Sequence, residues 1–201
     1  DTSASLADLN GLNGKTSVTI PVGSLTGVTG TAAELTALLG GQWTLATAPD
    51  FSGFDGDETI TLTGTVTVSD ANLAAGATTG IVTATLADSD VSALQVLAGT
   101  GNAYTITLTD TAAAASDVNT LDGKTTVAVD ARSVTTLVGD VAAVKTAIAS
   151  SGITTSTTYN VTLTDTSVSV ADANIVDADT TGIVTATITE GALATLAGLT
   201  G

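Results

Sequence analysis

Short stretches of the chain alternate apolar residues with small polar ones. Ile60 and Leu62 alternate with threonine, and Val127 and Val129 stand two residues apart in the same way. Alternation with period two puts the apolar side chains on one face and is typical of a half-buried β-strand. The pattern predicts strands at 17–21, 59–63, 80–86, 103–109, 125–130, 159–164 and 182–188.

A helical pattern surrounds four Asp-x-Asn triplets. Apolar residues stand two positions before the aspartate, one after it and four after it, as Val68, Ala71 and Ala74 do around Asp70. This spacing places them on one face of a short helix. The triplets are Asp8/Asn10, Asp70/Asn72, Asp117/Asn119 and Asp172/Asn174.

The flanks of these helices contain candidate caps. Asp-Thr pairs supply side-chain oxygens for the free N–H groups of a first turn, and Asn-Gly or Asp-Gly pairs suit a left-handed C-cap. We expect N-caps at 1–2, 110–111 and 165–166, C-caps at 13–14 and 122–123, and two fuller helices at about 30–39 and 139–150.

The order of these elements is repeated. The run from Asp70 to Leu86 returns 102 residues later, from Asp172 to Ile188, and the run 6–15 returns 109 residues later. Predicted strands 21–22 residues apart, with a helix between them, favour parallel neighbours and right-handed crossovers. We therefore predict one parallel, right-handed α/β solenoid over 1–201, resembling leucine-rich repeats in architecture, with short helices backing a parallel sheet.

The two large repeats are expected at about 1–109 and 110–201, with an insertion at 42–58. The insertion contains the only tryptophan, Trp43, and both phenylalanines, Phe51 and Phe54. Because Asp1-Thr2 matches a pair in the middle of a repeat, the sequence is expected to be an excerpt of a longer protein.

The composition of the chain argues against several classes of partner and site. Twenty acidic residues against four basic ones give a net charge of −16, which argues against nucleic acid or an anionic membrane as a partner. There is no cysteine or histidine, so the chain offers no disulfide, thiolate metal site or Ser-His-Asp triad. No apolar run approaches the roughly 20 residues of a membrane helix, so no membrane insertion is expected. We predict that the chain is not an enzyme.

Acidic residues gather in several loops. Calcium prefers six to eight oxygen ligands from carboxylates and carbonyls on a turn of small residues, and the run 55–58 offers such a turn. A solvated acidic surface is the simpler interpretation. The candidate calcium ligands are Asp50, Asp55, Asp57, Glu58, Asp88, Asp90, Asp177 and Asp179.

The Asp-x-Asn triplets also have two interpretations. An asparagine repeated in each unit can hydrogen-bond the backbone of the next unit and fix its register, because buried polar groups nearly always find partners. Metal ligation is the alternative. We favour the asparagine ladder.

Threonines occupy the outward positions of the predicted strands. Thr83 and Thr85, or Thr105 and Thr107, would form columns across neighbouring strands about 4.8 Å apart. Such arrays resemble the ice-binding face of β-solenoid antifreeze proteins, and a glycan is a second possible ligand. The simpler interpretation is that threonine favours exposed strand positions.

Several runs resemble the degenerate Thr/Ala/Asp-rich repeats of giant bacterial cell-surface proteins of the marine cyanobacterial type. They are VTLTDTSVSVADANIVDADTTGIVTATI, TITLTDT, LDGKTTVAV and VAAVKTAIASSGI. The resemblance implies a secreted or surface-attached, non-enzymatic, often calcium-stabilised module, and it carries no site residues. We expect a spacer, adhesin stalk or surface-layer component whose partners are neighbouring repeats of the same chain or lateral copies.

Overall fold

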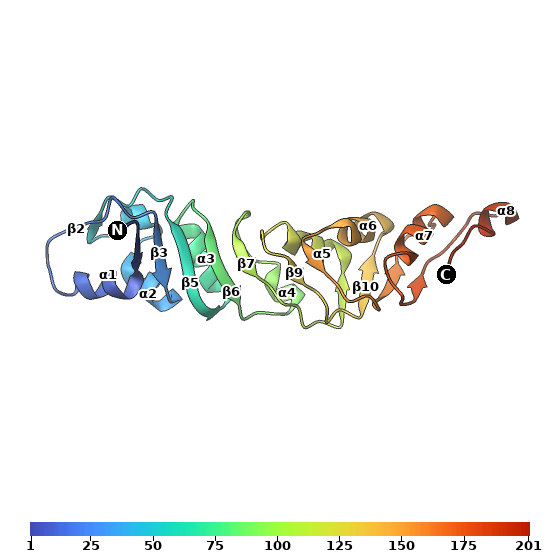
Figure 1. Cartoon of the computed structure of the whole chain (residues 1–201), viewed down its shortest axis with the longest axis horizontal. Helices are drawn as coiled ribbons and strands as arrows, with labels where there is room; N and C mark the ends of the chain where they lie inside the picture. Colours follow the sequence, from blue (N-terminus) through green and yellow to red (C-terminus); the bar gives the residue numbers. More distant parts are fainter. The chain divides into compact units, whose positions relative to one another are not determined.

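The computed structural model describes residues 1–201 and is a mixed α/β structure with parallel sheets and eight α-helices (Figure 1). Its contacts divide the chain into two compact units, described separately here. The first unit comprises residues 1–88, 96–105 and 124–127. The second comprises residues 89–95, 106–123 and 128–201. None of the helices is both long and apolar enough to cross a membrane.

The first unit is built on a five-stranded parallel sheet. Its order is β1 (Ser3–Ser5), β3 (Gly27–Gly30), β5 (Thr59–Val66), β6 (Val82–Leu86) and β7 (Ala103–Thr105). A second, two-stranded sheet pairs β2 (Ile20–Pro21) with β4 (Phe51–Ser52). The helices are α1 (Leu6–Asn13), α2 (Ala32–Leu39) and α3 (Val68–Ala77), with a 3₁₀ turn η1 (Leu45–Thr47).

The second unit has the same kinds of element. Its four-stranded parallel sheet has the order β13 (Val184–Thr185), β12 (Asn160–Leu163), β10 (Thr136–Gly139) and β8 (Ala112–Ala114). A two-stranded parallel sheet pairs β9 (Val129–Asp130) with β11 (Ile153–Thr154). Its helices are α4 (Val91–Leu94), α5 (Ala115–Asp122), α6 (Val141–Ala149), α7 (Val170–Asp177) and α8 (Leu193–Leu196).

The predicted helix pattern is confirmed at all four triplets. The helices α1, α3, α5 and α7 form there, and their i, i+3, i+6 residues are buried, with one exception. Leu12 is 48% exposed, whereas Leu121, the matching residue of α5, is fully buried. The fuller helices at 30–39 and 139–150 are also confirmed, as α2 and α6. Small aliphatic side chains therefore form most of the core in each unit.

The N-cap predictions are wrong in their residues, whereas the C-cap predictions have the right residues and the wrong conformation. The N-caps of α1 and α7 are Ser5 and Ser169, whose hydroxyls accept from N–H groups in the first turn, and the N-cap of α5 is Ala114, whose side chain makes no capping hydrogen bond. Gly14 and Gly123 follow their helices with φ of −66°, a right-handed conformation. In α1 and α7 a serine hydroxyl next to the helix therefore caps it in place of the expected Asp-Thr pair.

Each predicted strand overlaps an observed one, but the bounds differ. The strands β1, β3, β4, β8, β10 and β11 were not predicted, because short segments such as Ser-Ala-Ser, Gly-Val-Thr-Gly and Ala-Ala-Ala have no alternation of large apolar residues. Val127, expected on the inner face, is 38% exposed. The register of β5 and β6 shifts between Thr61 and Thr65, where Gly64 has a φ of +76°. A β-bulge at this glycine explains the length of β5.

The insertion at 42–58 packs into the first unit through its aromatic residues. Phe51 and Phe54 are buried, and their ring centroids lie 5.9 Å apart. Phe51 also begins β4 and pairs with Ile20. Trp43, by contrast, is 81% exposed. The insertion therefore extends the core while leaving its largest side chain on the surface.

Candidate functional site

The asparagines of the four triplets make the same hydrogen bond. Each side-chain amide donates to a backbone carbonyl 24 residues further along the chain, at 2.7–2.9 Å. Asn72 and Asn174 each make a second hydrogen bond. Their amide oxygens accept a backbone N–H 26 residues further on, from Ala98 and Thr200 respectively. The asparagine ladder is confirmed within each unit. The pairs are Asn10 with Glu34, Asn72 with Val96, Asn119 with Ala143 and Asn174 with Gly198.

The aspartates of the triplets have a different role. Asp70 completes a capping box, since its carboxylate accepts the Thr67 N–H while its own N–H donates to the Thr67 hydroxyl. Asp172 accepts from the Ser169 hydroxyl and forms an ion pair with Lys145 at 2.7 Å. The hydrogen bond from Lys145 lowers the pKa of Asp172. Asp70 and Asp172 therefore order the first turn of their own helices, whereas the asparagines bind backbone carbonyls 24 residues further along the chain.

A second set of carboxylates caps helices that precede them in the chain. In each case a carboxylate oxygen accepts the first N–H of a helix 19–24 residues earlier, at 2.7–2.9 Å. This N–H has no partner inside its helix, and the helix dipole favours negative charge there. The pairs are Asp88 with Val68, Asp110 with Val91, Asp165 with Val141 and Glu190 with Val170. Asp110 and Asp165 thus cap a preceding helix, where the sequence predicted the following one.

Threonine doublets provide a third repeated contact, which sequence reasoning missed. The hydroxyls of Thr78, Thr125 and Thr180 donate to the carbonyls of Glu58, Tyr104 and Tyr159 at 2.5–2.7 Å. The threonine after each one donates both its N–H and its hydroxyl to a carbonyl 23–24 residues earlier. The recurring Thr-Thr doublet was the signal that could have revealed these contacts.

Four of the predicted calcium ligands lie in the insertion. Asp50 accepts from the Asn13 amide at 3.0 Å. Glu58 is fully buried, and its carboxylate accepts the N–H groups of Asp55 and Gly56 at 2.9 and 3.1 Å. A hydrogen bond between the Asp55 and Asp57 carboxyl groups lowers the pKa of Asp55 and raises that of Asp57. The structure therefore brings Asp55 and Asp57 together and turns Glu58 inward as a loop anchor.

The other four lie apart from the insertion and have local partners. Asp88 caps α3, and Asp90 caps α4 and accepts from Ser92, which lowers the pKa of Asp90. Asp179 accepts from the Tyr159 hydroxyl at 2.5 Å, and Asp177 ends α7. No three acidic side chains come close enough together to form a metal-binding group. Calcium binding stays a prediction.

The threonine face is continuous only in the first unit. Thr29, Thr61 and Thr83 lie opposite one another across β3, β5 and β6. A second column joins residues 65, 85 and 105, and five of the six hydroxyl-bearing residues are exposed. In the second unit Val138 lies opposite Thr162 and interrupts the array. The columns are therefore three residues long.

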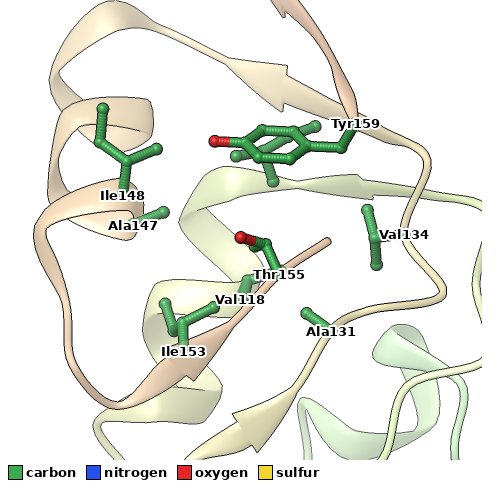
Figure 2. Close-up of a pocket in the computed structure, with 9 residues that line it drawn as sticks. Val118, Ala131, Val134, Ala147, Ile148, Ile153, Thr155 and Tyr159 are labelled. Atoms are coloured by element: carbon green, nitrogen blue, oxygen red, sulfur yellow. The ribbon is translucent and has the colours of Figure 1, made fainter. Parts of the chain in front are cut away.

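The second unit contains a small apolar cavity beside Tyr159 (Figure 2). Its volume is about 10 Å³, roughly the space needed for one water molecule. Figure 2 shows Ala147 and Ile148 on one side of it and Ala131 and Val134 on the other. The cavity is a packing gap in the core, too small for an organic ligand.

No protein-family model, curated protein or solved structure matches the chain.

Proposed function

We propose that the chain is a structural repeat module of a secreted or cell-surface bacterial protein, acting as a spacer, stalk or surface-layer component. In this proposal the strand–helix repeats stack as a right-handed α/β solenoid resembling leucine-rich repeats. The observation that carries the proposal is the asparagine contact, made four times with the same 24-residue offset. A side chain repeated in this way serves the attachment of one repeat to the next, as expected for repeat proteins.

The energetics of the repeated contacts support the same function. One intramolecular hydrogen bond contributes about 0.5–1.5 kcal/mol net. Each repeat contributes an asparagine contact, and many also contribute a carboxylate cap or a threonine doublet, so stability accumulates from neighbour to neighbour. Length is then delivered by adding repeats, and no catalytic group is needed.

The spacer function is tested by measuring the length of a tandem, which is two copies of the chain joined end to end. Gly201 corresponds to Gly99 in the repeat, and Asp1 corresponds to Asp110, so a copy of residues 100–109 joins two full chains in phase. Electron microscopy of this tandem should show particles about twice as long as the single chain and equally thick. A control has the same ten residues in shuffled order and should show a flexible joint. In-phase tandems that form compact particles would contradict the spacer function.

Calcium is proposed as a stabilising ion for the acidic loops. Asp55 and Asp57 are the ligands chosen for the test, because each carboxyl group shifts the pKa of the other, lowering it at Asp55 and raising it at Asp57. An ion that binds only the folded state stabilises by about 2.7 kcal/mol at a hundred times its dissociation constant. For the wild type, the melting temperature in millimolar calcium should be higher than the melting temperature in chelator. This difference should be smaller for Asp57→Asn. Equal melts in both buffers would leave these loops as solvated surface.

The alternative function is ligand binding by the threonine face, with ice or a glycan as the ligand. The aligned, exposed columns of the first unit favour it. Thermal hysteresis that is present in the wild type and lost in Thr83→Tyr and Thr85→Tyr would support the ice version. The absence of hysteresis in the wild type would remove that version.

A further inference from the structure

The chain contains one strand sequence twice, in two different environments. The segments TTGIVTATL (78–86) and TTGIVTATI (180–188) differ only in their last residue. Val82 and Ala84 are 0% and 3% exposed in the first segment. Val184 and Ala186, which match them, are only half-buried. Since the sequences are nearly identical, the difference in burial comes from the neighbours of each strand.

In the first unit the strand has a partner on both sides. β6 pairs with β5 on one side and with β7 on the other, where Tyr104 lies opposite Ala84. Tyr104 is fully buried, and the Asn102 amide oxygen accepts the Val82 N–H at 2.8 Å. β7 thus covers the small Ala84 with a large ring and continues the hydrogen bonding of the sheet.

The strand in the second unit has a partner on one side only. β13 is the edge of its sheet and pairs with β12 alone. β13 extends only over Val184–Thr185, whereas β6 extends over all of Val82–Leu86. A groove of about 200 Å³ lies along this edge, lined by residues that include Ala173, Asp177, Val184, Ala186, Ile188 and Leu199.

The surroundings of the two strands also correspond. Glu190 caps α7 as Asp88 caps α3. Asn174 binds the chain at 198–200 as Asn72 binds it at 96–98. Leu199, however, is 45% exposed, whereas Leu97, its counterpart, is 2% exposed. The groove beside β13 therefore corresponds in position to the place that β7 fills beside β6.

We propose that the edge of β13 binds a parallel β-strand with the sequence pattern of residues 102–108, Asn-Ala-Tyr-Thr-Ile-Thr-Leu. The proposal rests on the proposed stacking of repeats and identifies the surface and the partner chemistry by which it continues. The tyrosine would lie opposite Ala186, and the asparagine would accept the Val184 N–H. Strand addition of this kind gains main-chain hydrogen bonds from the open edge and specificity from alternate side chains.

A chain extended by one strand tests the proposal directly. Because Gly201 corresponds to Gly99, a second copy of residues 100–109 follows it in phase without a linker. Amide hydrogen exchange over 183–188 should slow at least tenfold in the extended chain. Exchange over 82–86 serves as an internal reference and should stay unchanged. The matched control has the same ten residues in shuffled order and should exchange like the unextended chain.

Two further comparisons make the result specific. Changing the appended asparagine to alanine should reduce protection at Val184 while leaving protection near Ala186. The proposal is overturned if the shuffled extension protects equally, if protection appears only outside 183–188, or if the unextended chain gains the same protection by dimerising at high concentration. The tandem experiment judges the spacer function separately, because it measures length and not the burial of this edge.

Discussion

At the scale of single residues, polar side chains with defined partners connect segments 24 residues apart in the sequence. The half-buried asparagines reach backbone carbonyls that lie in α2 and α6 or just after α4 and α8. Sequence reasoning could predict this ladder because the asparagine recurs in every triplet. It could not predict the carboxylate caps, because their partners lie 19–24 residues away and the residue type varies between aspartate and glutamate.

The asparagine contacts should differ in strength by the number of bonds each makes. Asn72→Ala removes two hydrogen bonds and is expected to lower the free energy of unfolding by about 1–3 kcal/mol. Asn10→Ala removes one and should cost about half as much. Asn13→Ala, which loses an exposed contact to Asp50, should cost less than about 0.5 kcal/mol. Urea unfolding of the three variants measures the series, and an equal cost for all three would refute the ladder as a stabilising feature.

The two tyrosines should respond oppositely to loss of their hydroxyl groups. Both are buried, but the Tyr159 hydroxyl donates to Asp179 while that of Tyr104 has no partner. Burial raises the pKa of Tyr104 to about 12. Tyr104→Phe should be neutral or stabilising by up to about 1 kcal/mol, and Tyr159→Phe should destabilise by about 1–2 kcal/mol. Chemical denaturation gives both values, and a larger loss from Tyr104→Phe would contradict the assignment of partners.

At the scale of elements, the helices were more predictable than the strands. Apolar residues at i, i+3 and i+6 define a helix face locally, so α1, α3, α5 and α7 follow from their own residues. Strands such as β8, with the sequence Ala-Ala-Ala, form because neighbours on the sheet position them, and such pairing leaves no local pattern. The nearly identical segments that contain β6 and β13 show the same effect, since the strand is longer where β7 pairs with it.

The link between α6 and α7 should depend on pH. Lys145 on α6 pairs with Asp172 on α7 and lowers the pKa of that carboxyl group. A carboxyl group whose pKa is lower in the folded state adds stability above its unfolded pKa, near 4, and loses it as the pH falls through the folded value. Wild type should therefore be more stable than Asp172→Asn at pH 6, and the difference should shrink below about pH 4 and disappear once the pH is below the folded pKa of Asp172. A difference that persists at pH 2 would show that the ion pair is not its source.

At the scale of the whole molecule, the same helix and strand sequences occur more than once along the chain. Offsets of 102 and 109 residues predicted the recurrence of helices and strands, and the parallel α/β class is confirmed. The eight predicted calcium ligands were spread over separate loops and do not form one group, because a local density of acidic residues does not determine which side chains meet in space. The fold class could therefore be predicted from the sequence more fully than the candidate calcium site.

The proposed solenoid is tested most directly by small-angle X-ray scattering of the 201-residue chain. A compact domain of this length has a radius of gyration of about 16–17 Å. The stacked repeats predict a clearly larger value and an asymmetric distance distribution with a long tail, both independent of protein concentration. A value near that of a compact domain, with a symmetric distribution, would contradict the solenoid and the spacer function derived from it.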